Sequence, residues 1–386
     1  MTKHNKILMT LLTIAFLGTA CHSSESLSLL SSSYSSSYIP SANNPYTNPV
    51  HPLVDGVKTE TYLADPFVVR DDDGTYYMYT TQSDVFTGGA SRQFVRGPVF
   101  ESVDLVNWEY KANVFASYTP DWGTTGAGVW APTVLKVGDL WNYYYSFSTG
   151  GDANPGIGVA TSSTPYGPWD HHGKLFNSLE IGVTNSIDPF VFYDEGLLYM
   201  AWGSFGGLIT MVELEADGLA LKGGLATQFD EKVAIAGYEL NEAKNYEATF
   251  ILRHGGYYYL FLSTGTCCSG VQSSYHVVVA RSESLKGPYL DSQGRGMFGP
   301  SRGDYVVVPT SSGVMGVGHM SLIEDDAGEL WMVYHGYDTK GDHSSWRVIY
   351  LDRIVFDETT GMPKVPGNKA SNHVEMPGPY IDTLEG

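Results

Sequence analysis

The chain has 386 residues, and its 42 acidic against 22 basic side chains give a formal net charge of −20. Nucleic-acid-binding proteins carry the opposite charge, so this class is excluded, and the acidic balance favours a protein that acts on neutral material. Aromatic residues make up 13% of the chain, with 27 Tyr and 8 Trp. Such rings favour β-sheets, and they also serve as apolar platforms in sugar-binding clefts.

The first residues have the features of an export signal. Lys3 and Lys6 precede an apolar run, 7–17, and the small residues after it end at Cys21. This run is too short to cross a bilayer as a mature helix. Residues 1–21 resemble a bacterial lipoprotein signal, although Leu17 lies four places before the cysteine where three are usual. We expect Cys21 to bear a lipid that anchors the exported protein at the outer membrane, on the cell surface or the periplasmic face; ordinary secretion is the alternative.

Residues 22–58 are rich in Ser, Asn and Pro and show no hydrophobic periodicity. This composition is typical of a flexible tether, which would hold a globular domain away from the membrane. We therefore expect one folded domain over residues 59–386.

Five stretches of this domain repeat one pattern: a short apolar strand, a polar turn with glycine, and a second strand rich in aromatic residues. They begin, 57 to 72 residues apart, at Asp65, Ala131, Asp188, Glu247 and His319. The glycines of the turns are Gly74, Gly138, Gly196, Gly255 or Gly256, and Gly328. The stretches that follow, 101–110, 158–173, 209–224, 277–291 and 348–363, have the character of outer strands. Five such units predict an all-β fold, a five-bladed β-propeller.

The innermost strands of a propeller start around one axis, so the residues that open the repeats should converge there. An aspartate before proline, as in Asp188-Pro189, is most often a turn residue. Three carboxylates at equivalent positions are better explained by function, because crowded carboxylates repel one another and lose solvation. Two of them facing a bond suit glycoside hydrolysis, in which an acid protonates the leaving oxygen and a base activates water. A third would raise the pKa of the acid.

Other catalytic signatures are missing from the sequence. It contains no G-x-S-x-G elbow, no phosphate-binding loop and no zinc-type histidine pair.

The chain resembles glycoside hydrolase family 43, and above all its arabinan endo-1,5-α-L-arabinosidases, in five motifs: "ADPFVVRDDDGTYYMY", "GVWAPTVLKVGDLWNYYYS", "NSIDPFVFYDEGLLYMAWGSFGG", "YEATFILRHGGYYYLFLSTGTCCSG" and "GVGHMSLIEDDAGELWMVYH". The motifs extend from residue 62 to about 356. The resemblance implies a five-bladed propeller that cuts arabinan, a pectin side chain, by single displacement with inversion. It makes Asp65 the general base, Glu247 the general acid, and Asp188 the residue that tunes the pKa of the acid. Inversion requires the acid and the base to lie roughly 6.5–9.5 Å apart, which leaves room for a water molecule.

The resemblance also implies a metal and a set of substrate contacts. His319 is expected beside a central calcium ion that is otherwise held mostly by water, a weak site by the standards of oxygen ligands. Residues expected to contact the substrate are Trp130, Asn185, Ser186, Ser204, Phe205 and Gly206. Arg347 is a further possible partner of the central acids.

Some features depart from the family pattern or stay open. Thr249 stands where a proline is more usual after the general acid, and Glu239 and Glu242 are rival acids in the loop before it. Cys267 and Cys268, which match a pair in the arabinanase-like branch, are either free thiols or a vicinal disulfide.

The alternatives to an endo-arabinanase are an exo-acting α-L-arabinofuranosidase or β-xylosidase, and an inactive propeller that binds polysaccharide. The expected partner is plant cell-wall arabinan, and we expect a monomer that touches the membrane only through its lipid.

Overall fold

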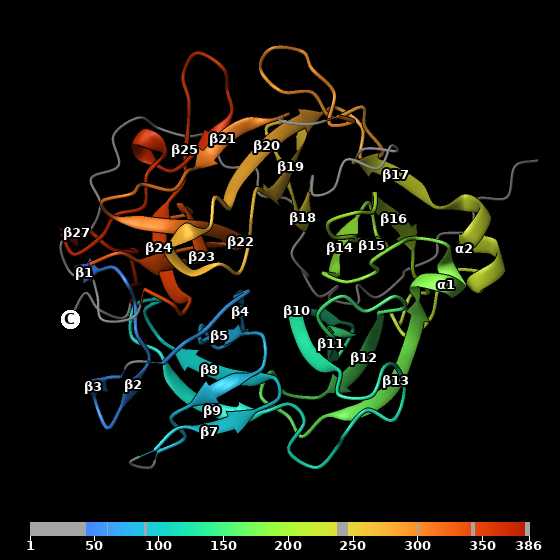
Figure 1. Ribbon diagram of the computed structural model, residues 1–386, viewed down its shortest axis with the longest axis horizontal. Helices are drawn as coiled ribbons and strands as arrows, with labels where there is room; N and C mark the ends of the chain where they lie inside the picture. Colours follow the sequence, from blue (N-terminus) through green and yellow to red (C-terminus); the bar gives the residue numbers. More distant parts are fainter. Residues whose placement is uncertain are drawn as a thin grey trace, which may run out of the picture.

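The structure is a computed structural model that describes residues 44–59, 61–88, 91–237, 246–299, 302–340 and 344–382. Five sheets stand around a central axis, which confirms the predicted five-bladed propeller (Figure 1). Their main strands are, blade by blade, β4 (Phe67–Arg70), β5 (Tyr76–Tyr79), β8 (Pro98–Ser102) and β9 (Glu109–Asn113); β10 (Gly128–Val137), β11 (Leu140–Ser148), β12 (Gly156–Ser162) and β13 (Asp170–Asn177); β14 (Phe190–Asp194), β15 (Leu197–Trp202), β16 (Ile209–Glu213) and β17 (Val233–Ala236); β18 (Glu247–His254), β19 (Tyr257–Thr264), β20 (His276–Ser282) and β21 (Asp304–Val307); and β22 (Val314–Glu324), β23 (Leu330–Asp338) and β24 (Val348–Arg353).

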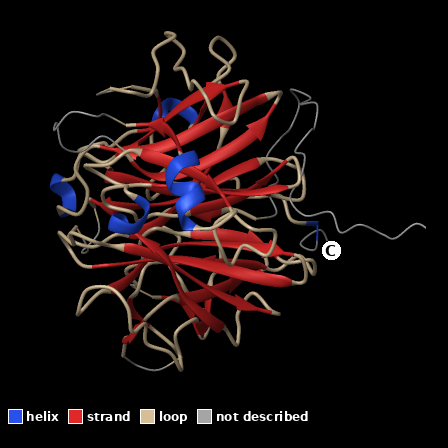
Figure 2. Cartoon of the chain, turned by 90° about the vertical axis from the view of Figure 1, so that its right-hand side faces the viewer, coloured by secondary structure: helices blue, strands red, loops and turns tan. Residues whose placement is uncertain are grey.

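Smaller elements decorate the blades. Short strand pairs are formed by β1 (Tyr46–Thr47) with β27 (Glu375–Met376), β6 (Ser83–Val85) with β7 (Gln93–Val95), and β25 (Val355–Phe356) with β26 (Pro363–Lys364); β2 (Leu53–Val54) and β3 (Val57–Lys58) extend the first blade. The helices are α1 (Ser178–Ile181), α2 (Leu225–Glu231), η1 (Gly270–Gln272) and η2 (Pro366–Asn368). Strands make up most of the molecule in the side view (Figure 2). None of the described helices has the length and apolarity needed to span a bilayer.

The repeat pattern determines how each blade is built. The first strand of every blade lies nearest the axis and the later strands follow outward (Figure 1). The predicted turn glycines Gly74, Gly138, Gly196, Gly256 and Gly328 all have positive φ, between +60° and +89°. Side chains other than glycine are strained in this conformation, which is why glycine recurs at these hairpin turns.

The core is divided among the five interfaces between neighbouring blades. One apolar cluster fills each interface, and Val68 of the first blade, for example, shares a cluster with Trp331 of the fifth. Blade-to-blade packing therefore fixes how the strand openings are placed around the axis.

The predicted boundary of the tether at residue 58 is wrong, because the chain is folded from residue 44 onward. Tyr46 and Val50 are buried in the cluster between the fifth and first blades. The N–H of Val50 donates to the Ile349 carbonyl at 2.9 Å, and the N–H of Leu351 donates to Oδ1 of Asn48 at 2.9 Å. This segment thus lies along β24, the outermost strand of the three-stranded fifth sheet. The predicted export signal and the rest of the predicted tether, 1–43, lie outside the described residues.

Candidate active site

Near the axis, the innermost strand of each blade has one residue in a left-handed backbone conformation, either just before the strand or inside it. The φ angles are +56° at Asp65, +43° at Ala131, +59° at Asp188, +57° at Ala248 and +49° at His319. Non-glycine residues rarely adopt such values, and they persist only where the surroundings enforce them. We call each of these residues the bend of its blade. In the fourth blade the bend is Ala248, so the prediction that Glu247 takes the same place as Asp65, Ala131, Asp188 and His319 is wrong by one residue. Trp130 occupies the place in the second blade that Glu247 occupies in the fourth.

The bends are held by the preceding blade, one after another around the ring. The N–H of Ala131 donates to Oγ1 of Thr81 (2.9 Å), that of Asp188 to Oγ of Ser146 (2.8 Å), that of His319 to Oγ of Ser263 (2.9 Å) and that of Asp65 to Nδ1 of His335 (3.2 Å). The N–H of Ala248 donates to the Asp188 carboxylate. Each blade therefore positions the first residue of the next one.

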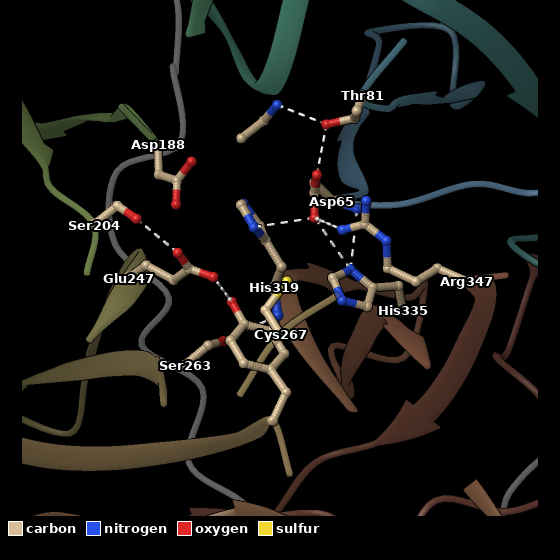
Figure 3. Close-up of polar contacts among 12 residues, drawn as sticks. Asp65, Thr81, Asp188, Ser204, Glu247, Ser263, Cys267, His319, His335 and Arg347 are labelled. Carbon is tan, nitrogen blue, oxygen red and sulfur yellow. Dashed lines mark hydrogen bonds and ion pairs between the residues drawn. The ribbon is translucent and has the colours of Figure 1, made fainter. Parts of the chain in front are cut away.

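Asp65 is a buried carboxylate surrounded by nitrogen atoms (Figure 3). Its Oδ1 lies 3.1 Å from Nη1 of Arg347 and 3.2 Å from Nδ1 of both His319 and His335. Its Oδ2 accepts a hydrogen bond from Oγ1 of Thr81 at 2.5 Å. Burial by itself raises the pKa of this carboxyl, but the Arg347 guanidinium and the two imidazoles outweigh it and hold the pKa well below the usual value. Asp65 is therefore ionised, as a general base must be.

Glu247 and Asp188 lie together on the other side of the close-up from Asp65 (Figure 3). Oε2 of Glu247 accepts from Oγ of Ser204 at 2.7 Å, and Oε1 accepts from the Tyr275 hydroxyl at 2.6 Å. Burial raises the pKa of Glu247 to about 6, although these two hydrogen bonds lower it. Burial and the charge of Glu247 raise the pKa of Asp188 well above its usual value. The pair therefore keeps a proton at a pH where Asp65 has lost its own.

The predicted substrate residues differ in how deeply the structure buries them. Ser186 is 0% exposed, and its hydroxyl donates to the Val183 carbonyl at 2.8 Å and accepts from Nε1 of Trp202 at 3.0 Å. The hydroxyl of Ser186 thus has partners inside the protein, and its contact with the substrate stays a prediction. Ser204 is also buried, and it positions Glu247.

Four predicted contacts remain accessible. Trp130, Asn185 and Phe205 are half-buried, and Gly206 is exposed. Nδ2 of Asn185 donates to the Phe205 carbonyl at 3.2 Å, so these two segments hold each other. The Phe205 ring meets the Tyr275 ring edge-on, with centroids 6.3 Å apart. Since Tyr275 also binds Glu247, Phe205 lies close to the acid.

Several residues of the site were not predicted from the sequence. They are Thr81, Ser146, Ser263 and His335, which hold the bends, and Tyr275, which binds Glu247. A signal for the first four exists: each lies at or near the end of the second strand of its repeat, where the sequence reads "TT", "SFS", "LST" and "YHG". Tyr275 follows a loop that does not belong to the repeated pattern, so the sequence gives no comparable signal for it.

The two neighbouring cysteines, Cys267 and Cys268, form a disulfide, so the alternative of free thiols is wrong. Their loop continues into η1, where the N–H of Val271 donates to the Ser344 carbonyl at 3.1 Å, close in sequence to Arg347. The rival acids Glu239 and Glu242 lie outside the described residues.

Asp65, Asp188, Glu247, His319, His335 and Arg347 lie together near the axis, and we call them the hub. No cluster of three or more His, Cys, Asp or Glu suited to a metal occurs among the described residues. Calcium takes six to eight oxygen ligands, whereas His319 offers nitrogen and faces an oxygen that already neighbours the positive Arg347. These side chains do not fit a calcium site of their own. The calcium ion stays a prediction, and no step below is derived through it.

The chain is similar to known proteins in both sequence and fold. The family described as "Glycosyl hydrolases family 43" matches residues 46–362. An extracellular exo-α-(1→5)-L-arabinofuranosidase of Cellvibrio japonicus is 30% identical over 295 residues, which are 72% of this chain and 80% of the relative. An arabinan endo-1,5-α-L-arabinosidase of Aspergillus niger is 30% identical over 321 residues, 78% of this chain and 90% of the relative. The solved α-L-arabinanase of Cellvibrio cellulosa with arabinohexaose superposes with a TM-score of 0.67 at 29% identity, covering 80% of this chain and 96% of that one. The chain belongs to glycoside hydrolase family 43.

Proposed function

We propose that the protein is an inverting glycosidase that cuts internal α-1,5-linked L-arabinofuranosyl bonds of arabinan. The observation that carries the proposal is the contrast in surroundings of the acids: Oδ1 of Asp65 lies 3.1 Å from the Arg347 guanidinium, which favours the ionised form, whereas Glu247 lies beside Asp188, and their pair favours holding a proton. A base without a proton facing an acid with one is what single displacement requires. The names of the relatives supply the bond and the sugar.

The proposed reaction uses these groups as follows. Asp65 accepts a proton from a water molecule as the water oxygen forms its bond to the anomeric carbon. The glycosidic carbon–oxygen bond breaks, and the proton of Glu247 passes to the leaving oxygen. Asp188 and Glu247 repel each other when both are charged, so the pair holds one proton before the reaction, and we assign that proton to Glu247 at the moment of cleavage. Ser204 and Tyr275 hold the carboxyl of Glu247 in position throughout.

A second function, exo-acting cleavage that releases single arabinose units, is favoured by one observation. The Cellvibrio japonicus relative is named an exo-arabinofuranosidase although it is as similar in sequence as the endo-acting Aspergillus niger protein. The two modes share the hub and differ in whether the cleft is open at both ends.

Product analysis separates these functions. The protein is incubated with linear arabinan, branched arabinan and xylan, and early products are resolved by chromatography, with Glu247→Gln as the inactive control. We expect mixed oligosaccharides from linear arabinan, and a loss of at least about 100-fold in the variant. Arabinose alone from the first time points would establish the exo mode instead. Equal turnover by the wild type and the variant would contradict the role of Glu247.

We also propose that the protein is exported and acts as a monomer anchored by lipid at Cys21. The support is the signal-like segment 1–21 and the word "extracellular" in the name of the Cellvibrio japonicus relative. Lipid labelling and fractionation of cells that express the wild type or Cys21→Ser test the anchor. We expect label only in the wild type, and unlabelled soluble wild type would show ordinary secretion.

A further inference from the structure

One tryptophan of the propeller is exposed to solvent beside the catalytic hub. The structure describes all eight tryptophans, and only Trp346, at 57% exposure, is classed as exposed. It immediately precedes Arg347, whose guanidinium contacts Asp65. Single exposed apolar side chains are common on protein surfaces, so the inference rests on the contacts that hold this ring and on its place beside Arg347.

The indole of Trp346 is held in one orientation by neighbours from the first blade. It stacks on Tyr62, with ring centroids 5.1 Å apart and an angle of 16° between the planes. The guanidinium carbon of Arg92 lies 4.5 Å from the centre of the same Tyr62 ring. We call these three residues the aromatic platform. A ring fixed in this way loses little conformational entropy when a ligand settles on it.

The aromatic platform is tied to the hub through the backbone on both of its sides. The N–H of Leu63, next to Tyr62, donates to the Arg347 carbonyl at 3.0 Å. Oγ of Ser83 donates to the Tyr62 carbonyl at 2.6 Å. Because three residues of extended chain span at most about 11 Å, the Tyr62 backbone lies within that distance of the Asp65 backbone. The platform therefore stands at the junction of the first and fifth blades, at the rim of the site.

The chemistry of the platform suits a neutral sugar. An aromatic face packs against the C–H face of a sugar ring, and the exposed indole of Trp346 offers such a face. Neither the catalytic acids nor the predicted substrate contacts belong to this surface.

We propose that Tyr62, Arg92 and Trp346 form a binding subsite for a sugar residue of the polymer at a distance from the bond that is cut. This inference rests on the proposed function. Its consequence is a preference for long chains, because only a substrate that reaches beyond the hub can occupy the platform.

The test compares Trp346→Ala, Trp346→Phe and a matched control, Tyr305→Ala, which removes a ring of 59% exposure from β21 on the fourth blade. We measure kcat and KM on α-1,5-arabino-oligosaccharides of two to six sugars. In Trp346→Ala we expect kcat/KM on the longest to fall about 10-fold through KM, a change typical of losing one stacked ring. We expect little change on the shortest, near-wild-type values in Trp346→Phe, and no effect of Tyr305→Ala.

A second readout keeps the inference separate from the function on which it rests. Calorimetry measures the binding of arabinohexaose and arabinobiose to Glu247→Gln with and without Trp346→Ala, and we expect weaker binding of the hexaose only. If the wild type degrades arabinan but Trp346→Ala matches it at every length, the platform is overturned and the function stands. If the wild type has no activity on arabinan, the proposed function fails, and unchanged calorimetric binding of both sugars then overturns the platform as well. A uniform loss of kcat/KM at all substrate lengths would also overturn the subsite and would assign Trp346 a structural role. A change only in the molecular mass measured by sedimentation would overturn it as well and would assign Trp346 a role in self-association.

Discussion

Asp65 and Glu247 are both buried acids near the axis, yet their neighbours drive their protonation in opposite directions. Asp65 has Arg347 and two imidazoles within 3.2 Å of one oxygen. Glu247 has only hydroxyl donors on its oxygens, together with Asp188 nearby. Desolvation acts on both residues, so the difference comes from the close contacts of Asp65 with the Arg347 guanidinium and the two imidazoles. The sequence predicted the three acids because they open or nearly open their repeats, and the contact of Arg347 with Asp65 confirms the predicted pairing of Arg347 with a central acid.

Replacing Arg347 by glutamine is expected to shift the pH profile of kcat/KM to higher pH. Asp65 works ionised, so activity falls as the pH drops through its pKa, and Arg347 lowers that pKa. Glu247 works protonated, so activity falls as the pH rises through its pKa of about 6, which Arg347 also lowers. Loss of the cation raises both pKa values, and the acidic limb should move up by about one unit or more.

The matched control for this variant is Arg253→Gln, which removes the same charge from a surface ion pair with Asp194. Its profile should coincide with that of the wild type. A profile of Arg347→Gln that keeps both limbs in place while kcat falls would assign Arg347 to substrate binding and contradict its electrostatic role.

The strands that were predicted have a sequence pattern that recurs in every blade, whereas the strands that were missed lack such a pattern. The hairpins were found because their aromatic second strands and turn glycines recur in every blade. The fourth strands β17 and β21 were missed because long excursions separate them from β16 and β20. The sequence predicted four of the five bends correctly and missed the fourth by one residue, because the placement of Ala248 rather than Glu247 at the bend depends on the backbone.

Ser146→Ala is expected to lower both the free energy of unfolding and the activity. It removes the acceptor of the buried N–H of Asp188, and an unsatisfied buried donor costs about 1–3 kcal/mol of the free energy of unfolding. Since this bend carries Asp188, kcat should fall as well. Urea denaturation and kinetics of the purified variant measure the two effects.

Ser163→Ala, at an exposed position after the neighbouring strand β12, serves as the control and should stay within about 0.5 kcal/mol of the wild type. Ser146→Thr keeps a hydroxyl and should recover part of the loss. Unchanged stability in Ser146→Ala would show that the bend is held by packing alone.

The whole molecule is a closed ring, and its closure depends on a segment whose composition is that of a tether. The fifth sheet has three strands, and residues 48–50 run along its outer strand β24. The same junction of the fifth and first blades brings Arg347 to Asp65. Composition could not reveal this, because the apolar contribution of the segment rests on a few side chains such as Tyr46 and Val50 scattered among Asn and Pro.

A chain that begins at residue 59 is therefore expected to be much less stable than one that begins at residue 44. The shorter chain loses the burial of Tyr46 and Val50, at about 1.5–3 kcal/mol each, and exposes the edge of β24 to pairing with other molecules. The longer chain keeps every contact described above. Urea denaturation gives the free energies of unfolding, and size-exclusion chromatography detects association. If the shorter chain cannot be purified, the double substitution Tyr46→Ala and Val50→Ala in the full chain probes the same burial. Equal stability of the two truncated chains would show that residues 44–58 act as part of the tether. The contact between Arg347 and Asp65 would then be held by the blades alone.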